Sequence, residues 1–251
     1  MGFNLPTKSE ADYEGMKYKH YADLFFAACN RPWGEVEEAQ GYLIDILDFA
    51  KELEITAFGT NLRMSIDGYT FHNSTVKRNI PGSEVFSAPY PNTLNGRLFL
   101  PYRLCFDDRI IPNLYLEFVD GKVDLSKVAT GGLANMEWVM QVLQRDDGAS
   151  MVGEVALGTN PAFKKAMVNP LYTEKVAGSF HIALGRAYDN TVQYGRKVTC
   201  DNGVDSGIHI DLACMMLPRY GGGEVKLDGM VIQRDGRFLD PRLRLLNPTK
   251  K

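Results

Sequence analysis

Apolar residues recur at helical spacing in two stretches near the N-terminus. The first is Ser9–Cys29, with Ser9 placed to act as its N-cap. The second is Glu35–Leu53, with acidic residues in the first turn, where the helix dipole favours them. The apolar stripes are Tyr21, Leu24, Phe25 and Ala28 in the first stretch and Ala39, Leu43, Ile46, Leu47, Ala50 and Leu53 in the second. The pattern predicts two amphipathic helices.

From Ile55 onward the apolar period changes to two, which indicates strands. Leu62, Met64 and Ile66 alternate before Asp67-Gly68, which predicts a hairpin turn leading to Tyr69 and Phe71. The other predicted strands are Glu84–Ala88, Arg97–Phe106, Leu114–Val123 with a turn at Asp120-Gly121, Ile208–Leu217, and a hairpin over Glu224–Phe238 with its turn at Asp228-Gly229. Ala134–Gln144 is predicted to be a helix, since its apolar residues return to helical spacing.

Helices that precede a series of strands indicate an α+β fold, with a large mixed or antiparallel sheet and flanking helices. The sequence contains no internal repeat, low-complexity tract or linker that marks a domain boundary. We therefore expect residues 1–251 to form a single domain, with an N-terminal helical segment at 9–54 and a β-rich region at 55–240.

Composition narrows the class of protein. The chain has 251 residues, of which 45% are hydrophobic and 24% charged, as in ordinary globular proteins. Lys and Arg number 28 against 31 Asp and Glu, a net charge of -3. A chain with this balance has no broad basic field for phosphate backbones, so we expect no nucleic-acid partner.

The four cysteines, at 29, 105, 200 and 214, form no CxxC pair, which favours reduced thiols over a zinc ribbon or redox motif. No apolar run approaches the roughly 20 residues that span a bilayer. The N-terminus has no signal-peptide core, and Pro6 occupies a position where a myristoylation motif requires Ser or Thr. We expect a cytoplasmic protein without a membrane partner.

His209-Ile210-Asp211 lies in a predicted strand, where alternate side chains project to one face. An imidazole and a carboxylate are therefore directed to the same point, an arrangement that suits a metal ion. A hydrogen-bonded structural pair is the commoner outcome of such a motif and stays open.

Glu174, His181 and Tyr188 recur every seven residues. In a helix they would share one face, with neighbours about 10 Å apart. That separation is too large for one ion but suits the lining of a two-ion pocket. The alternative is a polar stripe on a surface helix, and Gly178 and Gly185 weaken helicity itself.

Glu84 and Glu154 interrupt apolar strand sequence. A carboxylate buried without a cation or a hydrogen-bond donor costs several kcal/mol, so each of these residues must face solvent or meet a positive charge. A metal ion is one such charge, and an outward-facing strand glutamate is the alternative.

Several separated segments resemble motifs of the aminopeptidase T-like metallo-aminopeptidases, in the same order along the chain. The matching segments are Gly59–Leu62 (GTDL in the family, with Asn61 for Asp), Ile80–Pro89 (NxPxGEVFTAP), Gly153–Leu157 (GEVAL), Asn160-Pro161, Thr173–Gly185 (DEKxxGTxHIALG), Ser206–Asp211 (SxIHxD) and the Asp228-Gly229 hairpin. The resemblance extends from about residue 10 to residue 240.

The resemblance implies a metal-dependent aminopeptidase that removes N-terminal residues from peptides with a water activated by two divalent ions. The implied metal ligands are Glu84, Glu154, His181, Tyr188, His209 and Asp211. Glu174 is implied as the general base, although its spacing to His181 differs from that of some family members, and Tyr188 as a group that stabilises charge. Carboxylate, phenol and imidazole ligands without a thiolate favour Zn²⁺, Co²⁺ or Mn²⁺.

Two alternatives of other classes remain. A related branch resembles 2,5-dihydroxypyridine dioxygenases, which hold one iron with two histidines and one aspartate and place a histidine where Glu154 stands. The other alternative is an inactive binding or structural relative. Glu154 and the intact segment around His181 favour the hydrolase.

The resemblance also implies a difference. The family begins with a sizeable α/β lobe, which this sequence lacks, so we expect altered selectivity for substrate length and altered turnover. We also expect a homodimer, because the predicted helices carry apolar residues that the missing lobe would cover. Those residues are Phe25, Phe26, Trp33, Leu43 and Phe49.

Overall fold

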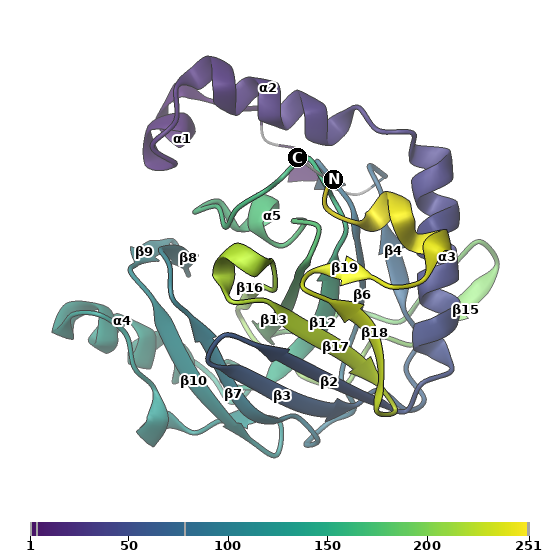
Figure 1. Ribbon diagram of the computed structural model, residues 1–251. Coiled ribbons are helices and arrows are strands. Elements are labelled where there is room, and N and C mark those ends of the chain that lie inside the picture. Colours follow the sequence, from purple (N-terminus) through teal and green to yellow (C-terminus); the bar gives the residue numbers. More distant parts are fainter. Residues whose placement is uncertain (1, 4, 78, 250–251) are drawn as a thin grey trace.

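The computed structural model describes residues 2–3, 5–77 and 79–249 (Figure 1). Its helices are α1 (Lys8–Tyr13), α2 (Tyr18–Cys29), α3 (Trp33–Asp48), α4 (Leu133–Leu143), α5 (Pro170–Thr173) and the 3-10 turns Leu125–Lys127, Pro218–Tyr220 and Pro241–Leu246. No helix in this part of the chain is long and apolar enough to cross a membrane.

An eight-stranded antiparallel sheet lies on one side of the core. In spatial order it contains β11 (Lys122–Val123), β10 (Leu114–Val119), β7 (Asn95–Leu100), β3 (Thr60–Ser65), β2 (Glu52–Ala57), β17 (Gly223–Leu227), β18 (Met230–Arg234) and β19 (Arg237–Phe238).

A second, five-stranded antiparallel sheet lies behind it in Figure 1. Its order is β16 (His209–Met215), β13 (Ser179–Gly185), β12 (Val152–Gly158), β6 (Glu84–Ser87) and β4 (His72–Ser74). Three two-stranded pairs complete the described strands: β1 (Gly2–Phe3) with β5 (Asn79–Ile80), β8 (Leu104–Phe106) with β9 (Arg109–Ile111), and β14 (Thr191–Gln193) with β15 (Arg196–Val198). The α+β fold class expected from the sequence is confirmed, with two main sheets instead of one.

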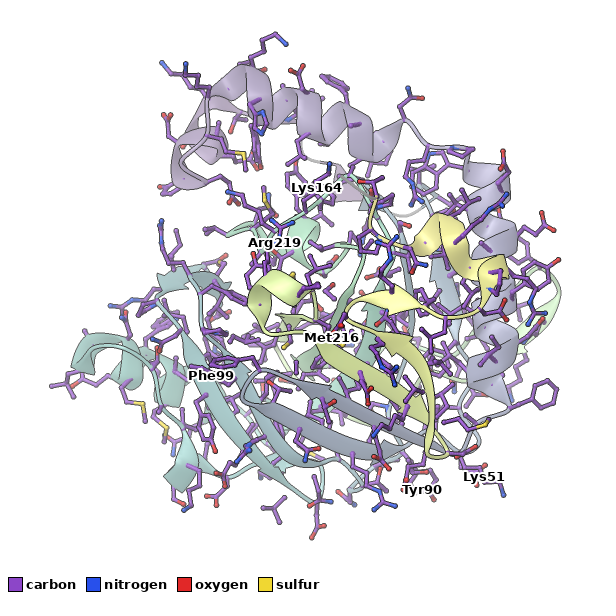
Figure 2. All side chains as sticks on the ribbon, in the orientation of Figure 1. Lys51, Tyr90, Phe99, Lys164, Met216 and Arg219 are labelled. Carbon is purple, nitrogen blue, oxygen red and sulfur yellow. The ribbon has the colours of Figure 1, made fainter. Side chains whose placement is uncertain are left out.

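One contiguous cluster of buried apolar side chains joins both sheets and α3. Met216, which directly follows β16, is fully buried and lies near the centre of the view in Figure 2. An added Cβ on Gly223 of β17 would lie 3.0 Å from its side chain, so the end of the smaller sheet packs tightly against the larger one. The opposite face of the smaller sheet is partly covered by α1, α2 and α5 through a second apolar cluster.

The N-terminal helices differ from the prediction in three ways. The predicted helix Ser9–Cys29 is two helices, separated by a turn in which Gly15 has a φ of 65°. The N-cap is Thr7 and not Ser9, because Thr7 and Glu10 form a reciprocal capping box. The second predicted helix begins at Trp33 and ends at Asp48, so Leu53 belongs to β2.

Two of the predicted strands also differ. Asp67-Gly68 forms a turn but no hairpin, since the strands before and after it, β3 and β4, belong to different sheets. The predicted strand Arg97–Phe106 is divided at Pro101, which cannot donate a ladder hydrogen bond, into β7 and β8. The turns at Asp120-Gly121 and Asp228-Gly229 are confirmed, with both residues of each pair at positive φ.

Candidate metal centre

Strand alternation places ionisable residues on one face of the five-stranded sheet. Glu154, Ala183 and Asp211 are cross-strand partners in adjacent strands and therefore share a face. His181 and His209 lie two residues from these positions, so they project to the same side. The residues on the opposite face belong to the core and are Val85, Val155, Leu157, Phe180, Ile182, Leu184, Ile210, Leu212 and Cys214.

A β-bulge puts Glu154 on this face. Val152 pairs with Leu184, whereas Glu154 pairs with Ala183, so one extra residue, Gly153, interrupts the alternation of β12. If Gly153 paired like an ordinary strand residue, Val152 and Glu154 would lie two positions apart in a regular strand and would face the same way. Only glycine fits, because an added Cβ at Gly153 would lie 2.3 Å from the carbonyl oxygen of Gly185.

Gly158, at the end of β12, has no side chain and so allows the backbone at Glu174 to pack close to the site. A Cβ at Gly158 would lie 2.7 Å from the backbone oxygen of Glu174 and 2.4 Å from that of Val176. The chain after α5 therefore packs directly on the sheet. Backbone hydrogen bonds between Asn160 and the segment 175–177 hold it there.

The helical arrangement considered for Glu174, His181 and Tyr188 does not occur. Glu174 is the C-cap of the short α5, and His181 lies in β13 after a turn at Gly178, whose φ is 84°. The seven-residue spacing thus has no helical meaning here. The expected separation of about 10 Å is also wrong for Glu174 and His181, whose ligand atoms lie within 4.8 Å of each other.

The structure brings six of the seven predicted site residues together as potential ligands. Three groups of side chains have ligand atoms that all lie within 4.8 Å of one another. The groups are Glu84 with Glu154 and His181, Glu154 with His209 and Asp211, and Glu174 with His181 and Asp211. Since the groups share Glu154, His181 and Asp211, they form one continuous centre.

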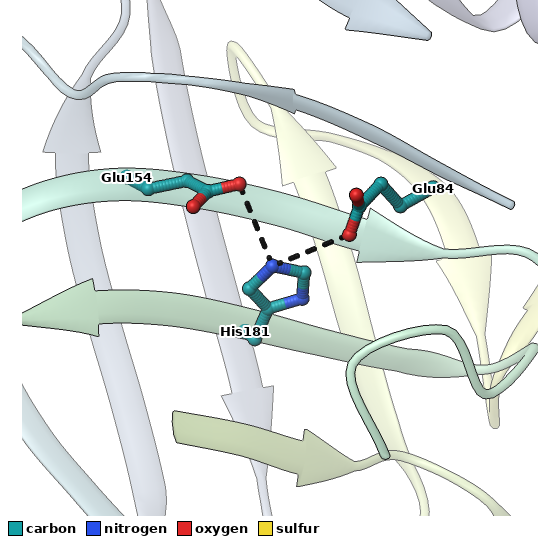
Figure 3. A group of neighbouring side chains, drawn as sticks. All are labelled: Glu84, Glu154 and His181. Carbon is teal, nitrogen blue, oxygen red and sulfur yellow. Dashed lines mark ion pairs between the residues drawn. The ribbon is translucent and has the colours of Figure 1, made fainter. Parts of the chain in front are cut away.

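Glu154 connects the two histidines. Its Oε1 lies 3.6 Å from Nε2 of His181, and its Oε2 lies 3.0 Å from Nε2 of His209. Figure 3 shows His181 between Glu154 and Glu84, whose Oε2 is also 3.6 Å from Nε2. One carboxylate that offers a separate oxygen to each of two histidines is suited to bridge two ions.

His209 has a fixed orientation. Its Nδ1 lies 2.7 Å from the carbonyl oxygen of Arg186, which can only accept a hydrogen bond. Nδ1 therefore donates, and Nε2 faces Glu154 and Asp211, at 3.0 and 3.5 Å. Such a backbone partner is the usual way to orient a metal-binding histidine.

The backbone on the other side of the centre, at Glu84, is held by buried polar side chains. Gln40 donates to the carbonyl oxygen of Glu84 at 3.2 Å. The hydroxyl groups of Ser83 and Thr159 lie 2.7 Å apart, and Arg31 donates to Ser83 at 2.7 Å. These contacts fix the strand end from which Glu84 projects.

Most of the centre is buried. The exposed fractions of Glu84, Glu154, Glu174 and His181 lie between 1% and 6%. Neither Glu84 nor Glu154 is therefore the outward-facing strand glutamate that was the alternative. The side chains of Asp211 and His209 are 19% and 27% exposed and mark the more open side. A small cavity of about 10 Å³ reaches Asp211 and shares Cys105, Val168 and Pro170 with a surface groove of about 640 Å³.

Mutual charge shifts the pKa values of the centre. Burial alone would raise the pKa of Glu154, but hydrogen bonds from His181 and His209 outweigh it and lower that pKa. Burial opposes charge on His209, yet hydrogen bonds to Asp211 and Glu154 raise its pKa to about 11, and Glu154 likewise raises the pKa of His181. Burial and the nearby charge of Asp211 raise the pKa of Glu174 well above its usual range. In the absence of metal ions, protons occupy this centre.

Tyr188 lies at the open side of the centre. Its ring centroid is 5.1 Å from that of His209 and 5.0 Å from that of Phe86. The charge of Glu154, followed by burial, raises the pKa of its phenol. The structure thus places Tyr188 beside the ligand groups, while its predicted function as a ligand stays a prediction.

Sequence reasoning assigned no function to Lys175, which is 1% exposed. Its Nζ forms ion pairs with Glu84 and, at 2.5 Å, with Oε1 of Glu174. The charges of Glu174 and Glu84 outweigh burial and raise its pKa, so Lys175 stays charged. The only sequence signal was its place beside Glu174, since burial of a lysine is not visible in a sequence.

A family model described as thermophilic metalloprotease (M29) matches residues 2–238. Aminopeptidase 2 of Geobacillus stearothermophilus is 28% identical over 225 residues, which are 82% of this chain and 51% of that protein. Aminopeptidase T of Thermus aquaticus is 29% identical over 175 residues, which are 64% of this chain and 40% of that protein. The chain therefore spans about half the length of these relatives or less.

Two solved structures share the fold. Wild-type AmpT from Thermus thermophilus superposes with a TM-score of 0.68 and 20% identity, over 89% of this chain and 59% of that one. The 2,5-dihydroxypyridine dioxygenase from Pseudomonas putida KT2440 gives a TM-score of 0.65 and 13% identity, over 89% of this chain and 64% of that one.

Proposed function

Because the chain belongs to the thermophilic metalloprotease (M29) family, we propose that it is an aminopeptidase that uses two divalent metal ions to remove N-terminal residues from peptides. The observation that carries the proposal is the position of Glu154, whose two carboxylate oxygens face two different histidines. The relatives named aminopeptidase 2 and aminopeptidase T support the same activity.

The donor atoms fit a pair of ions. Glu84, Glu154 and His181 would hold one ion, and Glu154, His209 and Asp211 the other. Glu84 Oε2 is buried and has no hydrogen-bond partner among the described residues, which is costly unless a cation compensates it. Carboxylate and imidazole donors without a thiolate favour Zn²⁺, Co²⁺ or Mn²⁺.

The net charge of the centre also supports the binding of two divalent ions. Four carboxylates and one ammonium group, with neutral imidazoles, have a net charge of -3. Charge of that size in a buried site must be neutralised by protons or by cations. Two divalent ions and one hydroxide supply the compensating charge of +3.

Divalent ions bound there would lower the pKa of a water molecule and polarise the scissile carbonyl group. Glu174 would accept the proton of that water and transfer it to the leaving amine. Its raised pKa supports this function, because a more basic carboxylate is a better proton acceptor. Tyr188, at the open side, would donate to the developing oxyanion.

The test is metal reconstitution of the purified protein. Metal-free protein should regain hydrolysis of an amino-acid p-nitroanilide with Co²⁺, Zn²⁺ or Mn²⁺, at about two ions per chain. One tightly held iron without hydrolysis would indicate the dioxygenase alternative, whose relative shares the fold. Two ions without turnover on any peptide would indicate the inactive alternative.

We also propose that the chain forms a homodimer, although some of the apolar residues that were expected to be exposed are buried. Phe25 and Leu43 are buried within the chain, whereas Phe26 and Phe49 are 57% and 88% exposed. Light scattering at micromolar concentration tests the proposal, and a mass that stays near 28.1 kDa on concentration would contradict it. The expected cytoplasmic location and single-domain organisation stay predictions.

A further inference from the structure

Lys175 is a permanent cation inside a centre that would bind cations. It lies between Glu84 and Glu174 and is excluded from solvent. A buried ammonium group is costly, and its two carboxylate partners compensate that cost. Two carboxylates that contact a lysine are, however, less available to a metal ion. The position of Lys175 therefore affects which oxygens remain for metal binding.

Two groups of potential ligands compete for His181. One combines it with Glu84 and Glu154, and the other combines it with Glu174 and Asp211. Nε2 of a single imidazole serves one ion at a time. The choice between the two groups decides whether Glu174 is a metal ligand or remains free to act as a base.

The contacts of Lys175 favour the first group. Lys175 binds Oε1 of Glu84, which leaves Oε2 directed toward His181 at 3.6 Å without another partner among the described residues. Glu174 is held by Lys175 through its Oε1, and a ligand oxygen of Glu174 lies within 4.8 Å of one of Asp211.

We propose that Lys175 is a positioning residue that selects the metal ligands. By binding one oxygen of Glu84 and one of Glu174, it presents the second oxygen of Glu84 to the ion at His181 and keeps Glu174 outside the metal shell. This inference rests on the two-metal function proposed above and adds a residue to which that function assigns no part.

The first experiment needs no change at Lys175. Protein loaded with Co²⁺ absorbs visible light in bands that depend on the ligands of the ion. Wild type and Glu174→Gln should bind about two ions each and give the same spectrum, because Glu174 is not a ligand. An altered spectrum of Glu174→Gln would overturn the proposal.

The second experiment removes the cation with Lys175→Met, which keeps the length of the side chain. Glu174, released from Lys175, should join the ion at His181 and change the Co²⁺ spectrum. The double variant Lys175→Met/Glu174→Gln should restore the wild-type bands. A double variant with the same spectrum as Lys175→Met would contradict the proposal, as would a single variant with the wild-type spectrum.

A matched control is Lys226→Met, which removes a partly exposed lysine that pairs with Glu224 on β17. Its spectrum should equal that of wild type. If Lys175→Met does not fold, the comparison of wild type with Glu174→Gln decides alone. Failure of wild type to bind two ions or hydrolyse peptides would contradict the proposed function itself, whereas active wild type with an altered Glu174→Gln spectrum would contradict only the selection by Lys175.

Discussion

The two faces of the five-stranded sheet are built by the same strands but have opposite chemistry. On one face Val155, Ile182 and Leu212 belong to the apolar core between the sheets. On the other face Glu154 and Asp211 belong to a cluster of ionisable groups. Adjacent residues of one strand therefore serve separate purposes, so single substitutions should affect either stability or metal binding.

Removing a ligand should have the largest effect. His209→Ala or Asp211→Ala should reduce the metal content from about two ions per chain to about one, and peptide hydrolysis should become undetectable. Metal analysis of the purified variants, together with p-nitroanilide hydrolysis, measures both. Ile210→Val, on the opposite face of the same strand, is the matched control and should cost only about 0.5–1.5 kcal/mol of stability. An unchanged metal content in His209→Ala would remove that residue from the centre.

Glu174→Gln should retain both ions but lose about 10²- to 10⁴-fold in kcat, because the amide cannot accept a proton. KM should change little if Glu174 acts only in the chemical step. Steady-state kinetics on the metal-loaded variant provide the measurement. Full activity would show that another group is the base.

A pair of neighbouring substitutions separates the two faces directly. Ile182→Ala should lower the free energy of unfolding by about 2–5 kcal/mol and leave the metal content unchanged. Ala183→Leu adds a side chain between Glu154 and Asp211, its cross-strand partners, and should weaken metal binding by about ten- to a hundredfold. Denaturant unfolding and metal titration of both variants should give opposite rankings, and equal rankings would contradict the division.

The smallest expected effect is that of pH on metal binding. The pKa of His209 is raised to about 11, so its imidazole is protonated at neutral pH in metal-free protein, and Glu154 also raises the pKa of His181. A metal ion must displace a proton from each imidazole that carries one, and its affinity should therefore rise with pH, by about tenfold per pH unit for each proton displaced. Titration with Zn²⁺ between about pH 6 and pH 8 measures the slope. A flat profile would mean that the ions do not replace protons on the histidines.

Local pattern predicted most elements of the fold but not their connections. Apolar periodicity identified α2, α3, α4 and many strands, and the turns at Asp120-Gly121 and Asp228-Gly229 were correct. The sequence did not show that Asp67-Gly68 leads from one sheet to another, because β3 pairs with β2 and β7 whereas β4 pairs with β6. The apolar period within a strand does not show which other strand it pairs with.

The site residues were found mainly by resemblance, and their geometry was not. The alternation around His209 and Asp211 correctly indicated a shared face. A shared helix face was only one possibility for Glu174 and His181, whereas a turn at Gly178 and close packing on Gly158 bring them together. Lys175 was missed because its importance lies in its burial between two carboxylates, one of which, that of Glu84, is 91 residues away in the sequence.

The bulge at Gly153 determines which changes of length β12 can tolerate. Deleting Gly153 alone would remove the extra residue and leave Val152 and Glu154 on the opposite faces that they occupy now, across from Leu184 and Ala183. A one-residue insertion or deletion elsewhere in β12 would instead turn the residues on one side of it to the other face. Homologous strands should therefore tolerate the loss of Gly153 better than a change of length between Glu154 and Leu157. A designer who transfers this centre to another sheet could use either the bulged strand or a regular strand that is shorter by this one residue.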